Sequence, residues 1–389
     1  MFKKSSVLQA LSAVDPNLFD KLHAQITPEE IHRYLKAVSE TAAPFQTVAD
    51  TRGRVIENLL QDDDLLSGAG IRFDRNYRGT GNTVLLSGRE PKDKAIWLLA
   101  HLDTITYLTQ PGRPERVPLQ PICYHLMEPG QRPAVALEYD LDLGDYQKAA
   151  TGVIEVQDPD APPEFVPDEP QALMPGTRVC FQSELTWDPE TGTISGSLDD
   201  AGGAVALLMA FKFLAQYGLE IMLGFTDEEE GPAGTGSQSF SRGGARLANL
   251  FDPPQLAIVS DIHEAASMYG GEGPSTFGIG DGASFAPYSS SGVGAVTPAS
   301  LYRLLRELSD QLPEMGIRLN ENADGYVSRS EDINALRRTP NVALLGFLGM
   351  NRHFQRGPEE ANLNDLVDLA KAVVCLCLLT KTQFWGRTG

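Results

Sequence analysis

The sequence predicts an α/β fold in which helices sandwich a mixed, mostly parallel central sheet, with a small β-rich domain inserted. From residue 197 onward, apolar runs such as 220–226 (EIMLGFT), 255–261 (QLAIVSD) and 341–349 (NVALLGFLG) alternate with amphipathic helical patterns. This alternation is typical of βαβ units, whose parallel strands are covered on both faces. Residues 104–192 differ because they hold 13 of the 26 prolines, and proline disfavours long helices and central strands. We therefore expect this block to be the insertion.

The remaining elements follow from periodicity and turn residues. Residues 1–62 have a mostly helical pattern. Strands are expected within 71–88 and over 95–100, and helices over 202–218, 298–312 and 363–380. Residues 278–285 (GIGDGASF) lack the ending of a phosphate-binding loop, so we expect only a flexible loop there.

These patterns divide the chain into two predicted domains. Residues 1–103 and 193–389 form the α/β domain, with 1–34 as an N-terminal helical extension, and 104–192 form the inserted β-rich domain. The insertion is strongly acidic, with 15 Asp and Glu against 5 Lys and Arg.

Composition excludes several classes of partner. The chain has 32 Lys and Arg against 52 Asp and Glu, which gives a net charge of −20. Such a charge repels phosphate backbones and anionic lipid headgroups, so we expect neither nucleic acid nor a membrane as a partner. No apolar stretch approaches the roughly 20 residues that span a bilayer. The four cysteines form no CxxC pair or disulfide framework, which favours a reducing, cytoplasmic location.

Groups able to bind a metal follow the ends of four apolar runs. The runs 95–100, 220–226, 255–260 and 341–349 are followed within four residues by His101 and Asp103, by Asp227 to Glu230, by Asp261 and by His353. In open α/β sheets, ligands bind beyond the carboxyl ends of the strands. Asp199 precedes a long helix, whose N-terminus suits an anionic side chain. These side chains are therefore expected to share one crevice.

Two histidines with three carboxylates suit a pair of divalent cations, each held by one imidazole and one carboxylate, with a bridging carboxylate between them. The bridging role falls most naturally to Asp199. Asp103 is expected to assist catalysis by accepting the second ring N–H of His101 and fixing its tautomer. Glu229 is expected to bind a metal, and Glu228 to act as general base on a water. Because three glutamates are consecutive, Glu229 and Glu230 remain an alternative for these two roles.

Five strings carry a resemblance to a known family: HLDTITYLT, GSLDDAGGA, FTDEEEGPAGTGS, AIVSDIHEA and RHFQRGPEE. Together they resemble the tetrahedral-aminopeptidase family, which includes glutamyl (deblocking) aminopeptidases, among the di-zinc metallo-exopeptidases. The spacing from His101 to Asp199 leaves room for that family's β-rich insertion. The spacing from Asp261 to His353 leaves none for the dimerisation domain of the related carboxypeptidase branch. The sequence departs from the family at Ala201, where an arginine is usual.

The resemblance implies an aminopeptidase that removes N-terminal residues from short peptides with a metal-bridged water as nucleophile and Glu228 as base. It implies His101, Asp199 and Asp261 on one metal, and Asp199, Glu229 and His353 on the other. Zinc is the expected metal, with cobalt or manganese as alternatives. The resemblance also implies a homo-oligomer, from a dimer to a dodecamer, in which the insertion serves oligomerisation or substrate access.

Other interpretations stay open at this stage. A deacylase of N-acyl amino acids or a carboxypeptidase-like hydrolase would use the same two-metal chemistry. A non-catalytic metal-binding assembly subunit would have lost a ligand or the base, and no such loss is evident in the sequence. His263 is a candidate for substrate contact, with a plain surface histidine as the alternative.

Overall fold

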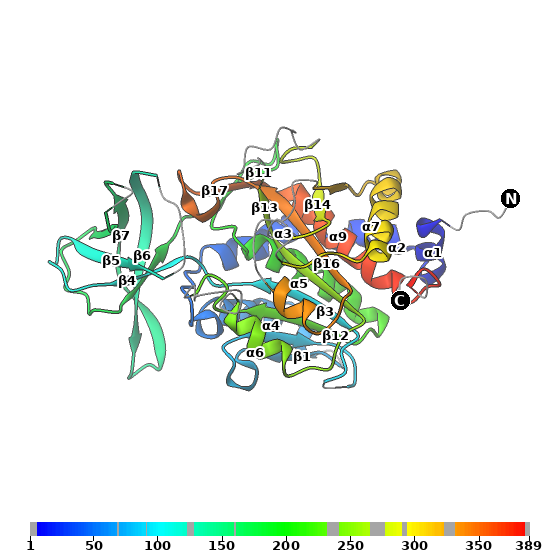
Figure 1. Ribbon diagram of the computed structural model, residues 1–389, viewed down its shortest axis with the longest axis horizontal. Helices are drawn as coiled ribbons and strands as arrows, with labels where there is room; N and C mark the ends of the chain where they lie inside the picture. The colour runs from blue at the N-terminus through cyan, green and yellow to red at the C-terminus, as the bar shows by residue number, and fades with distance from the viewer. Residues whose placement is uncertain are drawn as a thin grey trace.

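The structure is a computed structural model, which describes residues 6–67, 70–90, 92–122, 128–158, 161–231, 241–264, 277–289, 294–322 and 331–385. Within these ranges a mixed sheet of eight strands forms the centre of the molecule (Figure 1). Its strands, in spatial order, are β1 (Arg72–Asp74), β2 (Thr83–Leu86), β12 (Ile221–Thr226), β3 (Ile96–His101), β13 (Leu256–Glu264), β16 (Val342–Gly349), β14 (Ala283–Ala286) and β15 (Leu319–Glu321).

The four central strands run parallel, and antiparallel pairs occur toward the edges. β12, β3, β13 and β16 are parallel neighbours, whereas β2 is antiparallel to β12 and β14 is antiparallel to β16. The prediction of a mixed sheet is thus confirmed. The expectation of a flexible loop over 278–285 is wrong for its last residues, because β14 pairs there with β16, which lies far away in the sequence.

Helices cover both faces of the sheet because alternate residues of each strand point to opposite faces. Ile96 and Leu98 share a core with one group of helices, whereas Trp97 and Leu99 share the opposite core with a second, smaller group. The first group comprises α1 (Val7–Val14), α2 (Leu18–Gln25), α3 (Pro28–Ser39), α4 (Arg52–Asp62), α5 (Ala201–Leu214), α7 (Ala299–Gln311) and α9 (Leu363–Leu379). The second comprises α6 (Arg242–Ala248) and α8 (Asp332–Leu336).

The predicted N-terminal extension packs into the main core. Val7 and Leu11 of α1 are buried in the same apolar cluster as α9. Helix α3 begins as its sequence indicates: Thr27 accepts a hydrogen bond from the N–H of Glu30, and Pro28 occupies the first turn. None of the described helices combines the length and apolar character that a membrane crossing requires.

A small closed barrel lies at one end of the molecule, on the left in Figure 1. Its strands are β4 (Thr106–Thr109), β5 (Val117–Pro121), β6 (Gly130–Asp140), β7 (Asp145–Val156), β8 (Glu164–Pro167) and β9 (Arg178–Phe181). All lie within the predicted β-rich block. A three-stranded sheet of β10 (Thr186–Trp187), β11 (Thr193–Gly196) and β17 (Glu359–Asn362) crosses the expected boundary at 192. The division into domains at 103 and 193 stays a prediction.

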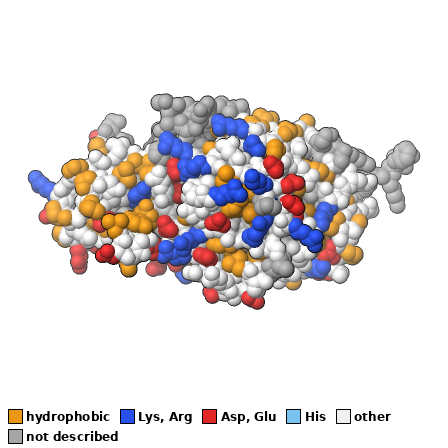
Figure 2. Space-filling model, turned by 90° about the horizontal axis from the view of Figure 1, so that it is seen from below, with side chains coloured by type: hydrophobic (Ala, Val, Ile, Leu, Met, Phe, Trp, Pro, Cys, Tyr) orange, Lys and Arg blue, Asp and Glu red, His pale blue; other side chains and the backbone are white. Residues whose placement is uncertain are grey.

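Basic and acidic side chains are mixed on one face of this acidic protein. Figure 2 shows Lys and Arg side chains across the centre of the lower face, with Asp and Glu side chains among them, although the chain carries a net charge of −20. The net charge therefore does not describe every face of the molecule.

Gly346 gives a test of the close packing between β13 and β16. It lies opposite Asp261, and a Cβ atom there would be 2.1 Å from the Asp261 main-chain oxygen. Because main-chain atoms cannot move aside easily, we expect Gly346→Ala to lower the free energy of unfolding by about 1–3 kcal/mol in urea titrations. In Gly278→Ala the new Cβ would meet only Asp281 Oδ2, at 3.8 Å. Equal stability of the two variants would contradict this packing argument.

Candidate metal centre

The carboxyl ends of the parallel strands bring together most of the predicted side chains. His101 ends β3, Asp261 lies in β13, and Asp199 directly precedes Asp200, the N-cap residue of α5. Their possible ligand atoms all lie within 4.8 Å of one another. We call His101, Asp199 and Asp261 the first triad. All three residues are buried.

Asp199 also belongs to a second group, with Glu230 and His353, whose ligand atoms again lie within 4.8 Å of one another. We call this group the second triad. His353 Nε2 lies 2.9 Å from Glu230 Oε1 and 3.5 Å from Asp199 Oδ2. The two triads thus share one carboxylate, as expected for Asp199.

The glutamate that lies beside His353 is one position later in the sequence than the main expectation. Glu230, and not Glu229, lies beside His353, while Glu229 groups with His101 and Glu230. Glu228 belongs to none of these groups, because its carboxylate accepts a hydrogen bond of 2.6 Å from Arg246. The main chain turns sharply there, with a φ of 62° at Glu228. This arrangement corresponds to the alternative register.

Asp103 holds the glutamate turn and does not orient His101 through its carboxylate. Its two oxygens accept the N–H groups of Glu229 and Glu230, at 3.1 and 2.9 Å. His101 Nδ1 lies 3.8 Å from that carboxylate but 3.0 Å from the Asp103 main-chain oxygen. Because a carbonyl only accepts, Nδ1 carries the hydrogen, and Nε2 faces Asp199 and Asp261 at 3.1 and 3.9 Å. The expected tautomer results, but the main chain fixes it.

Burial sets the protonation of this cluster. It raises the pKa of Glu229 and of Asp103 well above the ordinary range, and that of Asp227 to about 7. Burial acts in the same direction on Asp199, but Arg352 and His101 outweigh it and hold the pKa of Asp199 below its usual value. The chain's own cations therefore compensate some of the carboxylates and leave others in need of positive charge.

The donor set fits two divalent cations. Each triad offers one imidazole and two carboxylates, with Asp199 common to both, which are the ligand types that zinc prefers. Glu230 Oε1 and His353 Nε2 are buried atoms that pair with each other at 2.9 Å. Buried polar atoms in this state suit a cation that both can bind.

Sequence reasoning did not single out Arg352 and Glu359. Glu359 accepts the N–H groups of Leu198, Asp199 and His353, at 2.6, 2.8 and 2.9 Å, and so fixes the main chain of two candidate ligands. Arg352 donates from Nε to Asp199 Oδ2 at 2.7 Å. Both lie in the string RHFQRGPEE, but no local pattern there separates a buried charge from an exposed one.

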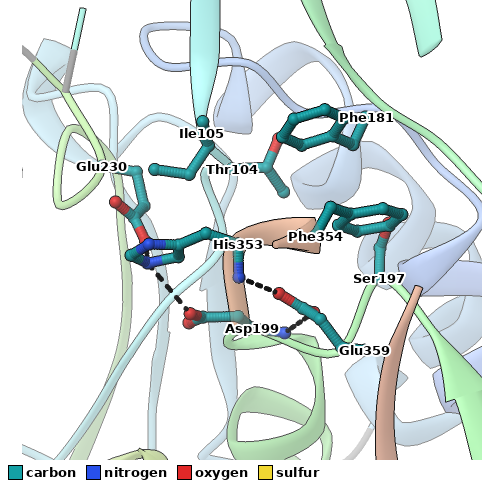
Figure 3. A pocket seen from close by; sticks show the side chains of 9 residues that line it. All are labelled: Thr104, Ile105, Phe181, Ser197, Asp199, Glu230, His353, Phe354 and Glu359. Atoms are coloured by element: carbon teal, nitrogen blue, oxygen red, sulfur yellow. Dashed lines mark hydrogen bonds and ion pairs between the residues drawn. The ribbon is translucent and has the colours of Figure 1, made fainter. Parts of the chain in front are cut away.

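A pocket opens beside the second triad. Figure 3 shows Asp199, Glu230 and His353 on one side of it and the rings of Phe181 and Phe354 on another. Phe181, from barrel strand β9, stacks on Phe354 with ring centroids 4.9 Å apart. The barrel therefore supplies part of the pocket wall.

The barrel also holds the segment that carries His353. This segment is the short 3₁₀ helix η7 (Arg352–Phe354). Arg132, from barrel strand β6, is buried and donates to the main-chain oxygens of Phe354, at 3.0 Å, and of Gln355. The Phe354 ring is buried in the barrel core.

His263 lies in the interior, away from the pocket. Its side chain is fully buried, and Nδ1 lies 2.5 Å from the Ser284 hydroxyl oxygen. Burial lowers its pKa to about 3, so the imidazole is neutral at physiological pH. The structure thus places His263 neither on the surface nor among the residues that line the pocket.

No protein-family model and no curated protein matches the sequence. Several solved structures share the fold. The TET1 peptidase of Pyrococcus horikoshii, described as assembling into a tetrahedron or a large octahedral shell, is 19% identical with a TM-score of 0.64, over 89% of this chain and 98% of that one. A TET aminopeptidase of a marine-sediment thaumarchaeon is 13% identical with a TM-score of 0.67, over 90% and 96%.

An aminopeptidase of the archaeon Desulfurococcus kamchatkensis is 16% identical with a TM-score of 0.67, over 93% of this chain and 98% of that one. These matches cover nearly the whole of both chains, so they include the barrel as well as the sheet. At such identities the likeness concerns the fold. The chain therefore has the fold of the TET peptidases.

Proposed function

We propose that the chain is a two-metal aminopeptidase that removes N-terminal residues from short peptides. The observation that carries this proposal is the pair of triads that share Asp199 beside a pocket, the first buried and the second buried except for a partly exposed His353. The fold supports it, because similar structures are described as aminopeptidases. The resemblance of the five sequence strings points to the same family.

We assign His101, Asp199 and Asp261 to one cation and Asp199, Glu230 and His353 to the other. Zinc fits these ligands best, with cobalt or manganese as alternatives. When bound, two such cations supply Lewis acidity toward the scissile carbonyl and lower the pKa of a water. All remaining steps fall to residues of the chain.

Glu229 is the general base in this proposal, in place of Glu228. Its carboxylate lies within 4.8 Å of the possible ligand atoms of His101 and Glu230, but Glu229 belongs to neither triad that shares Asp199. A carboxylate in this position can take the proton of the attacking water and return it to the leaving amine. Asp103 positions it, because its carboxylate fixes the N–H groups of Glu229 and Glu230.

The excess of carboxylates also explains why a free amino end would bind. An ammonium group is attracted by buried carboxylates that metals do not fully neutralise. Binding of the amino end at the site leaves only the first peptide bond within reach of the base. We also propose a homo-oligomer, since the similar TET1 peptidase is described as assembling into shells. A cytoplasmic location and the absence of nucleic-acid and membrane partners remain expectations.

The deacylase alternative requires an arginine for the substrate carboxylate. Arg352 is an arginine in contact with the triads, but its Nε donates to Asp199, and its side chain is not among those that line the pocket. This contact favours the aminopeptidase.

The test is a substrate panel on chelator-treated protein with Zn, Co or Mn added back. We expect hydrolysis of aminoacyl anilides and unblocked dipeptides, and none of the same peptides after N-acetylation, because acetylation removes the ammonium group. Hydrolysis of N-acyl amino acids without hydrolysis of anilides would establish the deacylase instead. Metal binding without hydrolysis of any substrate would support the assembly subunit.

A further inference from the structure

We propose that Arg352 is a built-in competitor for the second triad, so that the two metal sites fill unequally. This inference rests on the metal centre of the proposed function. The guanidinium holds the oxygen of Asp199 that faces His353, and its charge opposes a cation there. The first triad then fills at low metal concentration, and the second only at higher concentration.

The contacts of Asp199 divide between its two oxygens. Oδ1 lies 3.1 Å from His101 Nε2 and thus faces the first triad. Oδ2 lies 2.7 Å from Arg352 Nε and 3.5 Å from His353 Nε2 and thus faces the second triad. Arg352 therefore contacts the shared carboxylate through the oxygen that faces the second triad, whereas its interaction with Asp261 of the first triad is that of a nearby charge.

Burial makes this contact strong. The Arg352 side chain is 13% exposed and that of Asp199 is 4% exposed, so water screens the pair weakly. A guanidinium keeps its charge at any physiological pH. A divalent cation between Asp199 and His353 must therefore displace the guanidinium or bind against its repulsion, and either costs affinity.

The competitor and a candidate ligand are neighbours in a fixed stretch of main chain. His353 N–H donates to Glu359, and the main-chain oxygen of Phe354 accepts from Arg132. Asn351, His353 and Phe354 all have φ between 56° and 59°, a region that costs energy and persists only where surrounding contacts impose it. Because the main chain is held, the Arg352 side chain can swing away while His353 stays in place.

The experiment is a metal titration of full-length apoprotein with Co²⁺, followed by visible absorption and by calorimetry. We expect wild type to bind two ions, the second at least tenfold more weakly than the first. Arg352→Met should bring the second dissociation constant close to the first. Arg352→Gln removes the charge but keeps a hydrogen-bond donor, so it should also bring the two dissociation constants closer together.

Arg356→Met is the matched control. Arg356 lies in the same segment, but its side chain is 71% exposed and pairs with Glu128. We expect this variant to keep the wild-type difference between the two dissociation constants. All variants are checked for a native circular dichroism spectrum. The inference would be overturned if both Arg352 variants kept the wild-type difference between the two dissociation constants, or if Arg356→Met lost it. Either result would leave the metal centre intact. A wild-type protein that binds no Co²⁺ or Zn²⁺ would instead overturn the proposed function.

Discussion

Glu229→Gln is expected to lower kcat by roughly 10²- to 10⁴-fold, because an amide cannot accept the proton that a general base must take. Since Glu229 lies outside both triads that share Asp199, the variant should still bind two metal ions. Anilide hydrolysis gives kcat, and elemental analysis of the dialysed protein gives the metal content. Loss of turnover with full metal content is the expected combination.

Glu228→Gln provides the matched control within the same turn. Its carboxylate pairs with Arg246 and touches neither triad, so kcat should stay close to that of wild type. The reverse result, with Glu228→Gln inactive and Glu229→Gln active, would restore the register in which Glu228 is the base. Inactivity of Glu230→Gln together with loss of one metal ion would match its place beside His353.

Removal of the metal ions should abolish hydrolysis and also lower the melting temperature. The centre buries carboxylates that repel one another when no cation is present. A ligand at 100 times its dissociation constant stabilises the folded chain by about 2.7 kcal/mol. Two ions should therefore produce a clear rise in the melting temperature when zinc is returned to chelator-treated protein in a calorimeter.

Asp199→Asn tests whether that rise comes from the shared carboxylate. This variant should lose most of the zinc-dependent stabilisation, because an amide oxygen is a poorer ligand for both triads at once. Asp142→Asn, at an exposed position of the barrel, should keep it. A zinc-dependent rise of the same size in both variants would locate the stabilising ions elsewhere.

The central sheet could be predicted because its strands are defined locally. Four of its strands are continuous apolar runs followed by polar residues, and each strand lies at the run that predicted it: β3, β12, β13 and β16. β14 was missed because it has four residues in a glycine-rich stretch, and its pairing with β16 depends on a strand distant in sequence. The proline content predicted only that the inserted block is rich in β-strands. It could not predict the closed barrel, since the closure of six strands depends on long-range pairing.

The candidate site was predictable to the extent that strand ends define it. His101, Asp199, Asp261 and His353 converge as expected, because parallel strands end at one edge of the sheet. The glutamate register was not predictable. It depends on the turn at Glu228 and on the bonds from Asp103, and three identical side chains give no local signal for either.

The order of strands in the sheet has a consequence for synthesis of the chain. β3 lies between β12 and β13 in the sheet, and both of these strands follow the barrel in sequence. β3 is therefore synthesised before either of its two neighbours. His101 leaves the ribosome long before Asp261 and His353. Because domains form from the N-terminus as they emerge, the barrel can close early, whereas the metal centre cannot exist until His353 has emerged. A chain truncated before His353 would lack one member of the second triad, so the proposed metal centre would stay incomplete even with all the central strands before β16 in place.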